Sequence, residues 1–148
     1  MLPLIILAGP TGSGKSATAL ELANKLGSEI VSADSMQVYK YFDIGTAKPS
    51  REIRRMVPHH LIDILEPEEK FDAYQFKTQA LSWARKIVSQ GKVPLIVGGT
   101  GLYLKTLMLG YDCAVMVSPE INSQVKSEID KWGTCRVHEE LEAVDPES

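Results

Sequence analysis

A glycine-rich segment at residues 7–16, LAGPTGSGKS, constrains the fold of this chain more strongly than any other part of the sequence. It contains the pattern G-x-x-x-x-G-K-[ST], whose fixed positions are Gly9, Gly14, Lys15 and Ser16. Glycines at this spacing let successive backbone N–H groups face phosphate oxygens, and the helix that follows adds its positive end. The segment therefore predicts a strand, a phosphate-binding loop and a helix in succession.

The side chains of the loop have separate expected roles. Lys15 can reach the outer phosphates as a point charge, and the Ser16 hydroxyl can bind Mg²⁺, which we expect as the cofactor. Most chains with such a loop act on the terminal phosphate of a nucleotide, and they usually carry a second apolar strand that ends in Asp. The apolar stretch at 93–99, VPLIVGG, ends in glycines instead, which argues against that chemistry. The residues expected to bind a diphosphate or a nucleotide are Gly9, Pro10, Thr11, Gly12, Ser13, Gly14, Lys15 and Ser16.

Strand and helix patterns alternate through the first 110 residues. Strands are predicted at 3–8, 29–35 and 93–99, with a further strand or an extended loop at 59–65. Helices are predicted at 15–26, 72–90 and 102–109. The run at 3–8 is continuously apolar, as in a central strand of a parallel sheet. This alternation indicates an α/β fold, a P-loop NTPase-like parallel sheet flanked by helices.

The remaining residues have a different pattern. Two further helices are predicted at 118–133 and 134–146, and no strand follows them. We interpret residues 1–110 as the phosphate-binding core and residues 111–148 as the first helices of an incomplete helical insertion.

Three polar segments follow predicted strands, and the carboxyl ends of parallel strands meet at one edge of a sheet. These segments are Gly9–Ser16, Ala33–Gln37 and Gly98–Gly101. Asp34 lies in the second segment and could serve as a metal ligand, a general base or a helix cap. Its surroundings, ADSMQVY, combine a carboxylate, a hydroxyl, an amide and an aromatic ring. Such a set can hold a nucleobase and take a proton from its exocyclic amine.

Charge is unevenly distributed along the chain, whose net charge is −3. Residues 40–60 carry five basic and two acidic side chains, whereas residues 120–148 carry eight acidic and three basic ones. A nucleic-acid partner needs a local basic face, and 40–60 is the candidate segment. An ordinary solvated surface is the alternative interpretation.

Other bulk features favour a cytoplasmic protein. No apolar run reaches the roughly 20 residues that a membrane span needs, so no membrane partner is expected. Cys113 and Cys135 lie far apart without histidines at metal-binding spacing, which argues against a zinc site or a disulfide scaffold. No obligate protein partner is evident.

Four segments together resemble the tRNA dimethylallyltransferase family in sequence, order and separation. They are GPTGSGKS, SADSMQVYKYFDIGTAKPS, VPHHLIDILEP and VGGTGLY. The resemblance is dense over residues 4–110 and continues weakly to DP at 145–146. It implies transfer of a dimethylallyl group from dimethylallyl diphosphate to N6 of the adenosine immediately 3′ of the anticodon in tRNA, with release of diphosphate.

The resemblance also implies roles for particular residues. The loop would hold the diphosphate through Lys15 and Mg²⁺ at Ser16, and Asp34 would act as the general base on the adenine amine. These three residues are the expected catalytic ones. The residues that match tRNA contacts are Asp34, Ser35, Met36, Gln37 and Thr100. Asn122 is the further residue expected at tRNA, and it stands where the family often has an arginine that touches tRNA.

The family continues well past the matched segments, with more insertion helices, a return to the core and a downstream arginine at the diphosphate. We therefore expect this chain to be the amino-terminal portion of such an enzyme and inactive alone. A genuinely short relative is the alternative to that reading. Three other functions stay open: a small-molecule kinase with the same loop, an adenylate isopentenyltransferase that acts on a free nucleotide, and a regulatory nucleotide-binding fragment. The GTAKP segment and the basic residues at 48–55 favour tRNA.

Overall fold

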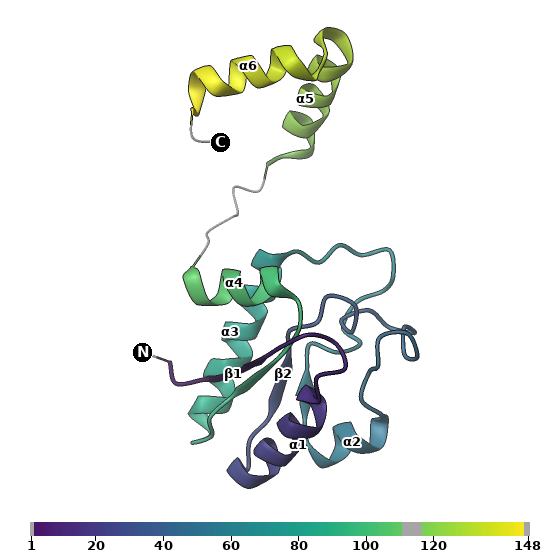
Figure 1. Ribbon diagram of the computed structural model, residues 1–148, viewed down its shortest axis with the longest axis vertical. Helices are drawn as coiled ribbons and strands as arrows, with labels where there is room; N and C mark the ends of the chain where they lie inside the picture. The colour runs from purple at the N-terminus through teal and green to yellow at the C-terminus, as the bar shows by residue number, and fades with distance from the viewer. Residues whose placement is uncertain (1, 111–116, 147–148) are drawn as a thin grey trace. The chain divides into compact units, whose positions relative to one another are not determined.

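The computed structural model of this chain describes residues 2–110 and 117–146. The chain divides into two compact units, Met1–Asp112 and Cys113–Ser148, which are treated separately below (Figure 1). Cys113 and the predicted start of the insertion at 111 lie outside the described residues.

The first unit is built on one parallel sheet of four strands, in the order β1-β4-β2-β3. The strands are β1 (Ile5–Ala8), β2 (Ile30–Ser32), β3 (His59–His60) and β4 (Leu95–Gly98). Both β1 and β2 pair with β4, because Leu95 is in register with Ile5 on one side and with Ile30 on the other. The predicted α/β class with a parallel sheet is confirmed.

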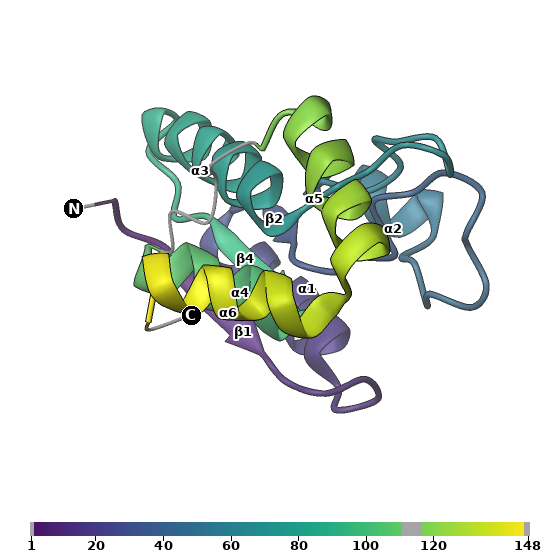
Figure 2. The same cartoon turned by 90° about the horizontal axis from the view of Figure 1, so that it is seen from above.

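Helices cover both faces of this sheet (Figures 1 and 2). The helices of the unit are α1 (Lys15–Leu26), α2 (Arg51–Met56), α3 (Ala73–Ser89) and α4 (Gly101–Leu109). Ala19 and Ala23 of α1 pack with Ile30 on one face. Phe76 of α3 and Tyr103 of α4 are in the core on the other face. Successive strand residues point to opposite faces, so a nearly continuous apolar strand supplies both cores.

Local sequence signals account for most helix ends. The Asp72 carboxylate accepts a hydrogen bond from Gln75 N, and the Gln75 side chain accepts one from Asp72 N, a capping box that starts α3. Gly27, with φ of 58°, ends α1 in the left-handed conformation that glycine adopts without strain. The predicted helices at 15–26, 72–90 and 102–109 are confirmed.

The structure corrects or completes the local predictions at three segments. The run at 3–8 is not a central strand within the described residues, since β1 pairs with β4 alone and its apolar side chains stay half-buried. The segment at 59–65, predicted as a strand or an extended loop, is a strand only over β3, because Leu61 and Asp63 have φ of 61° and 56° and leave the extended conformation. Helix α2, which begins where Ser50 Oγ accepts a hydrogen bond from Ile53 N, was not predicted.

The second unit is a pair of helices, α5 (Pro119–Trp132) and α6 (Thr134–Val144), which pack against each other. Ser118 Oγ accepts from Ile121 N at 3.4 Å, so the predicted cap and the two predicted helices are confirmed. Large apolar side chains of α5 are exposed, including Val125 and Trp132. None of the helices in the described residues is long and apolar enough to cross a membrane.

Candidate active site

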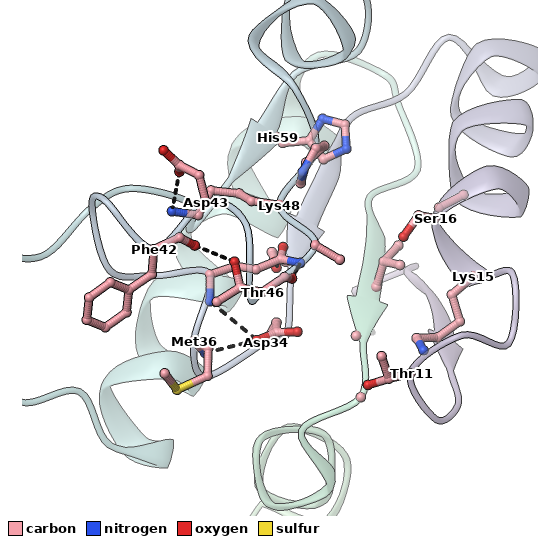
Figure 3. A pocket seen from close by; sticks show the side chains of 18 of the residues that line it. Thr11, Lys15, Ser16, Asp34, Met36, Phe42, Asp43, Thr46, Lys48 and His59 are labelled. Carbon is pink, nitrogen blue, oxygen red and sulfur yellow. Dashed lines mark hydrogen bonds and ion pairs between the residues drawn. The ribbon is translucent and has the colours of Figure 1, made fainter. Parts of the chain in front are cut away.

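A pocket of about 1100 Å³ lies at the carboxyl edge of the sheet in the first unit (Figure 3). Its lining includes Lys15 from the phosphate loop, Asp34 from the turn after β2, and Thr100 from the turn after β4. The structure therefore brings together the three polar segments that the sequence placed at one edge. A loop at 41–50 forms a further wall.

The phosphate-binding loop has the backbone that its glycines predict. Gly12 and Gly14 have φ of 80° and 85°, in the left-handed region where a side chain would be strained. Lys15 Nζ donates to Pro10 O at 2.5 Å and lies 3.5 Å from Ser13 Oγ. The ammonium is thus held across its own loop by two neutral acceptors, which the oxygens of a bound phosphate can replace.

Asp34 faces this loop from the opposite wall of the pocket (Figure 3). Its Oδ1 accepts from Met36 N at 2.9 Å and from Gln37 N at 3.3 Å, so the carboxylate caps the turn that follows β2. In the described part of the chain no hydrogen bond is made to Oδ2. One oxygen is fixed by the turn and the other is available to a ligand, so capping and proton acceptance are compatible roles.

The turn that carries Asp34 is joined to the end of β4 by direct contacts. Ser35 N donates to Thr100 Oγ1 at 2.9 Å, and Thr100 N donates to Ala33 O at 3.2 Å. Gly98 is required for this approach, because a Cβ there would lie 2.1 Å from Ala33 O. The Thr100 hydroxyl, which matched a tRNA contact in the sequence, is engaged with Ser35 in this structure.

Met36 and Gln37 have different surroundings although both were expected to contact tRNA. The Met36 side chain is exposed at the pocket. The Gln37 amide lies between two partners, with Oε1 accepting from Ser32 Oγ at 3.2 Å and Nε2 donating to Thr46 O at 3.1 Å. Gln37 therefore connects β2 to the loop at 41–50.

The loop at 41–50 was missed as part of the site. It has no residue pattern typical of catalysis, and its place beside Asp34 depends on contacts between distant segments. Tyr41 and Ile44 are 73% and 97% exposed, which gives the pocket an apolar rim. The Thr46 hydroxyl donates to Phe42 O within the loop.

His59 also lines the pocket and was not singled out from the sequence (Figure 3). Its Nδ1 lies 2.7 Å from Val57 O. Burial lowers the pKa of the His59 imidazole below its ordinary value, and the positive charge of Arg54 acts in the same direction. A neutral imidazole at pH 7 follows.

Three of the five cations in the candidate basic segment at 40–60 are paired within the protein. Lys40 Nζ lies 2.6 Å from Glu66. Lys48 Nζ lies 2.7 Å from Asp63, and Arg54 Nη1 lies 2.5 Å from the same carboxylate. The two basic side chains of this segment in exposed positions are Arg51 and Arg55.

The donor set of the pocket fits Mg²⁺. Ser16 lines the pocket next to Lys15, and its hydroxyl oxygen could hold the ion. The described residues contain no group of three His, Cys, Asp or Glu side chains able to hold a metal. Mg²⁺ is commonly bound through one or two protein oxygens together with the phosphates of a substrate, so a diphosphate would complete this site.

The IPP transferase family model matches residues 37–148 of this chain. The chain belongs to the IPP transferase family. A tRNA dimethylallyltransferase of Syntrophobacter fumaroxidans is 50% identical over 145 residues, 98% of this chain and 42% of that protein. One from Halorhodospira halophila is 44% identical over 99% of this chain and 47% of its own length.

Solved structures of tRNA isopentenylpyrophosphate transferases are similar as well. The full-length protein from Bacillus halodurans matches with a TM-score of 0.74 and 36% identity, over 99% of this chain and 49% of that chain. The Staphylococcus epidermidis protein matches with a TM-score of 0.69 and 44% identity, over 99% of this chain and 48% of that chain. This member of the IPP transferase family therefore spans about half the length of the relatives it matches.

The last predicted site residue, Asn122, lies on α5 in the second unit. Its side chain is exposed. The pocket described above is built from residues of the first unit alone.

Proposed function

We propose that this chain serves the transfer of a dimethylallyl group from dimethylallyl diphosphate to N6 of the adenosine immediately 3′ of the anticodon in tRNA, with diphosphate released. The observation that carries the proposal is the arrangement of Lys15 and Asp34 on facing walls of one pocket. The names of the similar proteins support the same reaction. The setting proposed for it is the cytoplasm.

In this proposal the diphosphate leaving group binds at the phosphate loop. As the allylic C–O bond breaks, negative charge grows on the diphosphate oxygen. Backbone N–H groups of the loop, the ammonium of Lys15 and the positive end of α1 stabilise that charge. Mg²⁺ held by Ser16 and the diphosphate would supply further positive charge.

The acceptor, the exocyclic amine of the adenosine, binds next to Asp34 in this proposal. N6 of the adenosine forms the new bond to C1 of the dimethylallyl group, and its excess proton passes to Asp34 Oδ2. Because Oδ1 is held by Met36 N and Gln37 N, the carboxylate keeps one orientation while the other oxygen takes the proton.

The rim of the pocket favours an RNA acceptor over a free nucleotide. Tyr41 and Ile44 offer exposed apolar surface on which unstacked bases can lie. An adenosine in an anticodon loop must leave its stack to reach Asp34, at a cost of a few kcal/mol that is smaller in an unpaired loop. A kinase is less favoured, since β4 ends in Gly98 and no carboxylate follows it in the turn.

The test is incubation of a full-length enzyme that carries this core, with Mg²⁺, labelled dimethylallyl diphosphate and one of two acceptors, tRNA or AMP. Label in tRNA at the adenosine 3′ of the anticodon supports the proposal. Label in AMP instead would assign the protein to free nucleotides. A parallel incubation with labelled ATP and small-molecule hydroxyl acceptors that yields phosphorylated product would contradict the proposal in favour of a kinase.

A further inference from the structure

Lys48 lies in the segment that the sequence predicted as a basic face, but only 1% of its side chain is exposed. Its ammonium lies 2.7 Å from Asp63 Oδ1, 2.8 Å from Tyr39 O and 3.0 Å from Asp43 Oδ1. An ammonium has three N–H donors, and three acceptors of the protein surround this one. A phosphate oxygen could bind Lys48 only by displacing one of them.

Asp63, the partner of Lys48, joins three parts of the first unit. Its Oδ2 accepts from Arg54 Nη1 of α2 at 2.5 Å. Its backbone N donates to Gln37 O, in the turn after Asp34, at 3.1 Å. Burial opposes ionisation of Asp63, yet the hydrogen bonds from Lys48 and Arg54 outweigh it and hold the pKa of Asp63 below its ordinary value. The carboxylate is therefore ionised at neutral pH and holds both cations.

Residues 41–47, the first part of the loop at 41–50, are attached to the rest of the site at two points. Near their carboxyl end, Thr46 O accepts from Gln37 Nε2 at 3.1 Å. Directly after them, Lys48 is bound to Asp63. The inner side of the loop lines the pocket that contains Asp34. A change at either attachment would alter the shape of the wall next to the proposed base.

We infer that Lys48 is a positioning residue of this site: paired with Asp63, it holds the loop at 41–47 against Gln37 and leaves phosphate binding to other side chains. The expected effect of Lys48 on transfer rests on the function proposed above. The structural claim, that a buried cation holds the loop in place, does not depend on the reaction.

Three variants separate this role from a phosphate contact. Lys48→Met removes the charge and keeps much of the length, and Lys48→Arg keeps the charge. Arg51→Met is the matched control, because it also replaces a cation by methionine, and Arg51 is exposed and takes no part in the contacts of Lys48. A fourth variant, Asp63→Asn, weakens the same ion pair by removing the charge of the carboxylate. It replaces Lys48→Met in the experiment if Lys48→Met does not fold.

Amide hydrogen exchange and pyrophosphate binding are measured first. For Lys48→Met we expect exchange of the amides at 41–47 to become roughly tenfold faster or more, with α1 and α3 unchanged. Arg51→Met should exchange as the parent does, and Lys48→Arg should recover most of the protection. The affinity for pyrophosphate should stay within about twofold in every variant, since the loop at residues 9–16 is distant in sequence and makes none of these contacts.

Transfer to tRNA and its salt dependence are measured next. In single turnovers, Lys48→Met should slow transfer on the order of 10–100-fold, the cost of a displaced site wall. The slope of log affinity for tRNA against log salt should not change. Arg55→Ala, which removes an exposed cation, provides the comparison: if Arg55 binds a phosphate of tRNA, its substitution reduces the slope by about 1.

Each result decides one of the two proposals. Unchanged exchange at 41–47 in Lys48→Met, a weakened pyrophosphate affinity or a reduced salt slope would overturn the positioning role. Absence of transfer to any acceptor by a full-length enzyme that carries this core would contradict the proposed function, while the exchange measurement would still decide the role of Lys48.

Discussion

Gly98 lies so close to the backbone of Ala33 that a Cβ at position 98 would be 2.1 Å from the Ala33 carbonyl oxygen and 2.8 Å from its Cα. The two residues sit where β4 and β2 end, and Ala33 N donates to Val97 O at 2.8 Å. The proposed base, Asp34, follows Ala33 directly. The position of the carboxylate therefore depends on the absence of a side chain on the neighbouring strand.

Gly98→Ala should destabilise the protein and displace the turn that carries Asp34. The added methyl group meets backbone atoms that cannot rotate away, and overpacking of this kind costs about 1–3 kcal/mol. Urea unfolding gives the change in the free energy of unfolding. Gly101→Ala is the control, because nothing lies within 4 Å of a Cβ there, and alanine in α4 should be neutral or stabilising. Equal stability of Gly98→Ala and the parent would show that the two strands can separate at no cost.

Lys15→Ala should weaken pyrophosphate binding by roughly tenfold to a hundredfold or more, the worth of a charge-assisted hydrogen bond. The fold should be retained, because the Lys15 ammonium donates to groups of its own loop, at Pro10 and Ser13. Isothermal titration with pyrophosphate measures the affinity, and circular dichroism measures the fold. Lys25→Ala, on the exposed side of the same helix, should bind as the parent does. An unaltered affinity in Lys15→Ala would remove the phosphate loop from the proposal.

Asp34→Asn should bind pyrophosphate normally and lose transfer by about 10²–10⁴-fold, the usual contribution of a general base. The amide oxygen can still accept from Met36 N and Gln37 N, so the turn is kept. The amide cannot accept the proton of the adenosine amine at neutral pH. Single-turnover transfer of labelled dimethylallyl groups to tRNA, in a full-length enzyme that carries this core, measures the loss. Activity within a few-fold of the parent would reduce Asp34 to a cap of the turn.

Glu29 should make stability depend on acid pH. Burial opposes its ionisation, but hydrogen bonds from Lys92 and His60, at 2.8 and 2.7 Å, outweigh burial and lower the Glu29 pKa below 4.5. Because the pKa is lower in the folded state, the stabilisation is present above the unfolded value and is lost as pH falls through the folded one. The free energy of unfolding should therefore fall as pH drops from about 5 toward 2, and less so in Glu29→Gln.

The control for this pH dependence is Glu21→Gln. Glu21 pairs with Lys25 on the surface of α1, where both side chains are more than two-thirds exposed. Exposed pairs contribute about 0–1 kcal/mol, so little change is expected at any pH. A pH profile of Glu29→Gln that coincides with that of the parent would mean that other carboxylates cause the acid sensitivity.

Features encoded within a few residues were predictable from the sequence. The glycine pattern fixes the backbone of the phosphate loop, and the caps at Asp72 and Ser118 set where two helices begin, because their hydrogen bonds join residues close in the chain. The order of strands and helices was sufficient to predict a parallel sheet, and hence that Asp34 and Thr100 would share an edge with the loop.

Tertiary structure decided which groups are free to act. Lys48 and Arg51 look alike in the sequence, yet one is buried against Asp63 and the other is exposed. Gln37 is engaged by Thr46, and Gly98 is needed only because Ala33 lies against it. Such contacts join segments far apart in the chain. Whether a charge is paired or a glycine is required depends on what the fold places within a few ångströms, which no local pattern encodes.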